Sequence, residues 1–115
     1  MPCLRSKKSY KGKIQMKVKI HKDEKGRTVI AVCDSNLLGK RIEEGNRQLD
    51  LTSDFYKGQE KTKEETGDLM RNAYIINIIG EESVKLAIDE GLIDKKHVIR
   101  IAGIPHAECI SVDLE

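Results

Sequence analysis

The sequence predicts an α+β fold: a two-layer sandwich with a mostly antiparallel sheet and two main helices on one of its faces. Short stretches of alternating apolar and polar residues lie towards both ends of the chain, two helical stretches lie between them, and brief polar turns connect these elements. A chain of 115 residues has room for one hydrophobic core. We therefore expect one domain over residues 13–115, preceded by a basic extension over residues 1–12.

The first predicted element is a β-hairpin. Apolar residues occupy every second position from Ile14 to Ile20, which is the pattern of a strand with one buried face. A polar turn containing Gly26 follows, and then a more continuously apolar run from Thr28 to Cys33. Asp34 comes next, and we expect its side chain to cap a short helical turn at residues 35–38.

The middle of the chain is predicted to hold short elements. Leu49 and Leu51 alternate with polar neighbours in a strand over residues 48–52, whereas residues 40–44 fit no single pattern. Residues 53–58 resemble one helical turn. This turn carries Phe55 and Tyr56, half of the aromatic residues in the chain. Their side chains either pack into the core or form a contact patch.

Two helices are expected next. Thr62 and Glu65 have the spacing of a capping box, which marks the start of the first helix. We expect this helix to continue to about Ile76 and to break over residues 77–80, although the β-branched residues at 75–79 also suit a strand. The second helix is predicted over residues 81–90, with acidic residues in its first turn and Gly91 after its end.

A second hairpin is predicted to close the fold, with strands at residues 98–101 and 108–112. Its tip contains Gly103, Pro105 and His106. Because glycine frees the backbone and proline restricts it, the imidazole is expected to have a defined position. Functional residues are often polar side chains on rigidly placed loops, so the tip is a candidate site.

Charge is unevenly distributed along the chain. The formal net charge is only +2, yet the first 13 residues contain five bases and no acid: Arg5, Lys7, Lys8, Lys11 and Lys13. Such a basic arm either contacts phosphates or keeps a solvated tail soluble. Cys3, Cys33 and Cys109 are odd in number and widely spaced, and no signal-like or membrane-spanning apolar run is present. We expect a cytoplasmic protein with reduced thiols and no membrane contact.

Three residues are candidates for chemistry. Cys33 could serve as a nucleophile with His106 as its base and Asp34 orienting the imidazole. This hypothesis requires the ring of His106 to lie close to Asp34. A metal site is not expected, because no CxxC pair is present and His106 and Cys109 would point to opposite faces of a strand. No cofactor is expected either, since neither glycine-rich phosphate-binding motif occurs.

Four segments resemble one known family. They read VIAVCDSNLLGK at residues 29–40, DFYKG at 54–58, NIIGEESVKLAIDEGLI at 77–93 and VIRIAGIPHA at 98–107. In this order they are similar to the small archaeal proteins grouped as domain of unknown function 424 (DUF424). The resemblance runs from about Met16 to the C-terminus and implies an archaeal cytosolic protein with a compact α+β fold and no established reaction. The family's motif positions match Cys33, Asp34, Gly39, Lys40, Phe55, Tyr56, Gly58, Asn77, Gly80, Gly103, Pro105 and His106.

The function favoured by the sequence is that of a non-catalytic binding module for RNA or a translation-related ribonucleoprotein. Lysine and arginine contacts to phosphates would supply the affinity. Besides the basic arm, the expected binding residues are Lys40, Arg41, Phe55, Tyr56, Asn77, Arg100, Gly103, Pro105 and His106. Two alternatives remain open: a small enzyme that uses Cys33, Asp34 and His106, and a protein–protein adaptor with an apolar patch around Phe55 and Tyr56.

Overall fold

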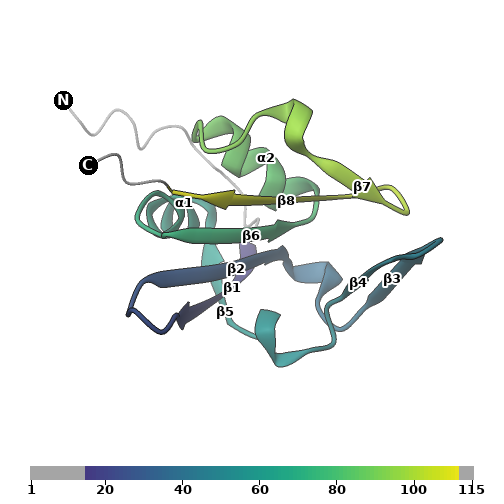
Figure 1. Cartoon of the computed structure of the whole chain (residues 1–115), viewed down its shortest axis with the longest axis horizontal. Helices are drawn as coiled ribbons and strands as arrows, with labels where there is room; N and C mark the ends of the chain where they lie inside the picture. Colours follow the sequence, from purple (N-terminus) through teal and green to yellow (C-terminus); the bar gives the residue numbers. More distant parts are fainter. Residues whose placement is uncertain (1–14, 112–115) are drawn as a thin grey trace.

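A six-stranded sheet forms the centre of the protein (Figure 1), in a computed structural model that describes residues 15–111. The strand order is β5-β1-β2-β6-β8-β7. Their bounds are β1 Gln15–Lys22, β2 Thr28–Asp34, β5 Gln59–Thr62, β6 Ile75–Ile79, β7 Ile99–Ile101 and β8 Ile104–Ile110. Only β2 and β6 pair in parallel, and every other pair of neighbours is antiparallel. The mostly antiparallel α+β fold expected from the sequence is therefore confirmed.

The remaining elements lie around this sheet. Helices α1 (Lys63–Arg71) and α2 (Glu81–Asp89) pack on one face, which we call the helix face. A separate hairpin of β3 (Arg41–Glu44) and β4 (Arg47–Asp50) reaches the tip of β7 and β8, where the amide of Ala102 donates to Glu44. Within residues 15–111, no helix combines the length and apolar character needed to span a membrane.

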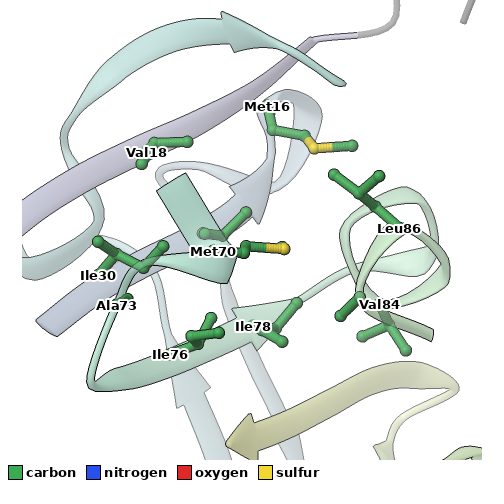
Figure 2. Packing of buried hydrophobic residues seen from close by; sticks show 11 residues of the cluster. Met16, Val18, Ile30, Met70, Ala73, Ile76, Ile78, Val84 and Leu86 are labelled. Carbon is green, nitrogen blue, oxygen red and sulfur yellow. The ribbon is translucent and has the colours of Figure 1, made fainter. Parts of the chain in front are cut away.

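The helix face is an aliphatic layer (Figure 2). Alternate residues of β1, β2 and β6 point into it, as strand geometry requires, and both helices contribute side chains from the other side. Its buried members are Met16, Val18, Ile30, Val32, Met70, Ala73, Ile76, Ile78, Val84, Leu86 and Ala87. The predicted capping box starts α1: the Glu65 amide donates to the Thr62 hydroxyl, and the Thr62 amide donates to the Glu65 carboxylate.

The opposite face, which we call the second face, is covered over only part of its area. The helical turns Ser35–Leu37 and Asp54–Tyr56 and the base of the β3–β4 hairpin pack on it. Their apolar side chains join those of the sheet in a second buried cluster made of Ala31, Cys33, Leu37, Leu49, Leu51, Tyr56, Ile79 and Ile101. On the same face, β7 and β8 leave the side chains of Ile99 and Ile110 about half exposed, at 46% and 52%.

One predicted helix boundary is wrong. Helix α1 ends at Arg71 instead of continuing to about Ile76, and residues expected to hold the break are part of strand β6. The β-branched side chains of Ile76 and Ile78 are buried against the helices, while Ile79 is buried on the second face. A strand with both faces largely covered reads as a continuous apolar run, and its neighbours in the sheet override the weaker helical periodicity.

The closing hairpin also differs from the prediction. Its turn consists of Ala102 and Gly103 alone, both with positive φ (51° and 82°), as a two-residue turn requires. Pro105 and His106 therefore belong to strand β8 and not to a loop. The carbonyl of Pro105 accepts from the Gly80 amide, and the Gly80 carbonyl accepts from the Val84 amide of α2, so Gly80 does not need the N–H that proline lacks. The basic arm lies outside the described residues.

Candidate functional site

The three residues proposed for chemistry do not meet. Cys33 is in register with Ile79 of β6, and Ile79 is in register with His106 of β8. Cys33 and His106 therefore point to the same face but are separated by two strand spacings, or roughly 10 Å. Ile79 fills the position between them. Within residues 15–111, the carboxylate of Asp34 bonds to helix α2 and not to His106.

Cys33 is a buried core residue. Its side chain has no exposed surface, and burial, followed by the neighbouring charge of Asp34, raises the pKa of its thiol to about 12. A reactive cysteine needs the thiolate, which a low pKa favours. The environment of Cys33 therefore opposes its use as a nucleophile.

Asp34 stabilises the start of helix α2 instead of the helical turn that follows it in sequence. Its carboxylate accepts hydrogen bonds from the amides of Glu82 and Ser83 and from the Ser83 hydroxyl, at 2.7–3.1 Å. It makes no side-chain cap to the turn at Ser35–Leu37, so that prediction is wrong. A side chain at Gly80 would overlap this carboxylate, because a Cβ placed there lies 2.3 Å from Asp34 Cγ.

His106 has an unusual environment on the second face. The ring is half-buried, and Nδ1 is a buried atom that finds no hydrogen-bond partner among residues 15–111. Burial lowers the pKa of His106 below its usual value of 6.5, and the nearby charge of Glu108 opposes this only in part. The imidazole is consequently neutral at neutral pH. Buried polar atoms in folded proteins usually have a partner, which makes this position a candidate for function.

Three polar side chains accompany His106 on the second face, and we call the four residues the open-face cluster: Tyr56, Asn77, His106 and Glu108. Asn77 is in register with Glu108, and His106 lies two positions before Glu108 on the same strand. Burial, followed by neighbouring Cys33 and Glu108, raises the pKa of the Tyr56 hydroxyl to about 12. Sequence reasoning missed Glu108, although the period of two in β8 places it beside His106 once that strand is known to begin at Ile104.

The other expected binding residues are dispersed. Lys40 and Arg41 lie at the β3–β4 hairpin, and Arg41 pairs with Glu43. Arg100 points to the helix face, where its guanidinium donates to Glu81 and to the carbonyl of Gly103. Pro105 is buried on that side. These residues do not form one surface with His106.

An open groove of about 430 Å³ lies at another sheet edge, beside the part of β1 that β5 does not cover. Three lysines line it, Lys19, Lys57 and Lys61, and we call it the lysine groove. Gly58 lets the chain approach β1 closely, because a Cβ there would lie 2.0 Å from the Val18 carbonyl oxygen. Sequence reasoning missed this groove, since the three lysines are brought together only by the pairing of β1 and β5.

Metal binding has no support from the arrangement of side chains. Over residues 15–111, no three histidine, cysteine or acidic side chains lie close enough together to hold an ion. Cys109 lies away from His106 on the helix side of β8, and its thiol donates to the Leu92 carbonyl. The remaining features define a small α+β domain with a lysine groove and a partly open sheet face.

The chain belongs to the DUF424 family. The family model described as a protein of unknown function (DUF424) matches residues 21–112. No curated protein matches the sequence. Among solved structures, the chain is similar to a crystal structure of an uncharacterized conserved protein from Methanopyrus kandleri, with a TM-score of 0.74 and 23% identity. The match covers 88% of this chain and 96% of that one, and it shows a shared fold.

Proposed function

We propose that the protein is a non-catalytic RNA-binding module that contacts backbone phosphates through the lysine groove. The observation that carries this proposal is one open groove at the edge of the sheet that Lys19, Lys57 and Lys61 all line, with Lys19 and Lys61 reaching the edge from opposite faces. Lysine side chains placed along a groove attract a phosphate backbone and release its counterions, which gives affinity without sequence readout.

The ammonium groups of this groove are available to a ligand. Lys19 and Lys61 have no ion pair within the described part of the chain, and Lys57 pairs only with the highly exposed carboxylate of Asp54 at 3.2 Å. An exposed pair of this kind contributes little energy, so a phosphate can replace the carboxylate at small cost. All three charges can therefore contribute to binding.

Two neighbouring features add support. Strand β1, which supplies Lys19, follows the basic arm of residues 1–12 in the sequence. His21 and Phe55, which lie close in sequence to the groove residues Ile20 and Lys57, stack with ring centroids 4.4 Å apart and an angle of 11° between the rings. Aromatic surfaces beside a basic groove are typical of proteins that bind single-stranded nucleic acid.

Fluorescence anisotropy with a short labelled single-stranded RNA, measured over a series of salt concentrations, tests this proposal. We expect the full chain to bind and the affinity to fall as salt rises. Replacing Lys19, Lys57 and Lys61 by Gln should lower the slope of log K against log salt by about 2, at about 0.7 for each phosphate that the variant no longer neutralises. Replacing Lys7, Lys8 and Lys11 by Gln measures the contribution of the arm.

The matched control replaces Lys25, Lys85 and Lys96 by Gln, which removes the same charge at exposed positions that do not line the lysine groove. This variant should keep most of the salt dependence. The proposal is wrong if the full chain does not bind RNA at low salt, or if the control weakens binding as much as the groove variant does.

The two alternatives have less support. The enzyme hypothesis needs a reactive Cys33 close to His106, and neither condition is met. The adaptor hypothesis needs an exposed apolar patch around Phe55 and Tyr56, but Tyr56 is buried and Phe55 stacks on His21. The most exposed large apolar residues, Ile20, Ile99 and Ile110, are not contiguous with that corner in sheet register.

A further inference from the structure

The open-face cluster presents hydrogen-bonding groups that the fold itself does not use. Within residues 15–111, neither the amide of Asn77 nor the carboxylate of Glu108 has a hydrogen-bond or ion-pair partner. The Asn77 amide is not a buried unpaired group, so it is reachable from solvent. As directly opposed residues on neighbouring strands, the two side chains start from Cβ atoms about 5 Å apart.

Glu108 keeps its full capacity to accept hydrogen bonds. The neighbouring imidazole of His106 is held neutral by burial, which lowers its pKa, so no salt bridge neutralises the carboxylate. Tyr56 is protonated because burial raises its pKa, and it adds no charge. The cluster therefore offers one anionic acceptor with two oxygens beside one amide that can donate.

We infer that the open-face cluster binds an unpaired guanine base of the bound RNA, with Glu108 and Asn77 reading its Watson–Crick edge. The inference rests on the proposed function and names a base-specific subsite for it. Guanine presents two adjacent N–H donors, at N1 and N2, followed by the acceptor O6. The carboxylate of Glu108 matches the two donors, and the amide N–H of Asn77 matches O6.

The other bases match this pair less well. Adenine places an acceptor at N1, where it would face the carboxylate, and uracil has one N–H between two carbonyl groups. Cytosine offers the N4 amino group as a donor but an acceptor at N3. Guanine is thus the only one of the four bases that gives a carboxylate two parallel hydrogen bonds from this edge.

The surroundings suit a nucleotide. Ile99 and Ile110 expose apolar surface on the same face, against which the flat side of a base can pack. Glu108 also borders an open groove of about 650 Å³ along the edge of β8, whose lining includes Lys95 and His97. Specific recognition of RNA commonly targets unpaired bases in this manner.

Titration of the full chain with guanosine monophosphate, followed by ¹H–¹⁵N NMR, tests the subsite apart from the lysine groove. We expect shifts in the Asn77 side-chain amide and in the β6 and β8 backbone signals. Adenosine and cytidine monophosphates should bind at least about tenfold more weakly, the discrimination typical of one bidentate contact. Inosine monophosphate lacks the N2 amino group. Its affinity should therefore lie between that of guanosine monophosphate and those of adenosine and cytidine monophosphates.

Glu108→Gln should lose the preference for guanine and Asn77→Ala should weaken it, whereas Glu24→Gln, at an exposed turn, should leave it unchanged. Equal affinities for guanosine, adenosine, cytidine and inosine monophosphates would overturn the inference. NMR shifts confined to strands other than β6 and β8, or an unchanged preference for guanine in Glu108→Gln, would also overturn it. Salt-dependent RNA binding through the lysine groove could still hold in that event. Conversely, a guanine preference without groove-dependent RNA binding would contradict the proposed function and leave the base subsite in place.

Discussion

The two faces of the central sheet are built differently. The helix face is closed by α1 and α2 over an unbroken aliphatic layer, in which Ile30, Val32 and Ile78 are fully buried. The second face is closed only where short turns and the β3–β4 hairpin cover it, and the rest carries polar residues such as Asn77 and Glu108. The helix face buries the larger apolar cluster, whereas the second face leaves polar side chains accessible to solvent.

This difference shows how a small domain can combine a stable core with an adaptable surface. Strand β6 contributes to both faces of the sheet within five residues. Ile76 and Ile78 point to the helices, while Asn77 points to the second face. Successive side chains on a strand face opposite ways, so a substitution at one position affects the core and the next affects the surface. Effects on the core and effects on the surface can therefore be measured separately with single substitutions in β6.

The largest expected loss of stability follows from removing a side chain on the helix face. Ile78→Ala should lower the free energy of unfolding by about 2–5 kcal/mol, because it removes buried methyl groups and leaves a cavity. Ile110→Ala, on the exposed part of the second face, should change it by about 0.5 kcal/mol or less. Urea denaturation followed by circular dichroism measures both, and similar losses in the two variants would contradict the proposed difference between the faces.

The buried thiol on the second face should be almost inert in the native protein. With the pKa of Cys33 raised from 9.0 to about 12, its thiolate fraction is lower by about a thousandfold. In a variant carrying Cys3→Ser and Cys109→Ser, we expect a disulfide reagent such as DTNB to react slowly with the folded chain and rapidly in urea. Fast labelling of the folded variant would show that this part of the second face is open.

A smaller effect is expected at the junction of β2 and α2. Asp34→Ala removes the acceptor of two helix amides and one hydroxyl and should cost about 2 kcal/mol of stability. Asp34→Asn keeps one acceptor oxygen and should therefore lose less stability than Asp34→Ala does. As a comparison, Asp94→Ala removes a single amide contact in the exposed turn at Lys95–His97 and should cost under about 1 kcal/mol. Thermal unfolding distinguishes these cases, and equal losses at Asp34 and Asp94 would show that Asp34 has no special role.

The smallest expected effect is a pH dependence from His106. Because burial lowers the pKa of His106 in the folded protein, the unfolded chain binds more protons between that lowered pKa and 6.5. The contribution to stability is present above pH 6.5 and is lost as the pH falls through the pKa of the folded state. His106→Gln should therefore flatten the stability profile below pH 6.5. Parallel profiles for both proteins, measured by urea unfolding at several pH values, would show that the ring is not buried in its neutral form.

Local sequence patterns anticipated much of the fold. The hairpin of β1 and β2, the start of α1 at Thr62 and the extent of α2 were predicted because strand alternation, capping and glycine termination act over a few residues. Strand β6 was divided between the end of a predicted helix and a break over residues 77–80, although its β-branched residues also suited a strand. Only the neighbouring strands β2 and β8, distant in sequence, decide between helix and strand.

The candidate sites depended more strongly on tertiary structure. Asn77, Tyr56 and His106 were expected to bind a ligand, but Glu108 was overlooked until the register of β8 was known. The lysine groove joins Lys19 of β1 to lysines about forty positions later, a separation that no local pattern can bridge. Asp34 was assigned to the wrong helical turn for the same reason, since its partners Glu82 and Ser83 lie in α2.

The amino-acid sequence by itself determined the α+β class, the family, the aliphatic character of the core and the uneven distribution of charge. Tertiary structure alone decided which polar side chains share a surface, because strand order and register bring together residues far apart in the chain. Burial is likewise a property of the assembled fold. It sets the pKa of Cys33 and His106, and so it decides that the thiol is inert and the imidazole neutral.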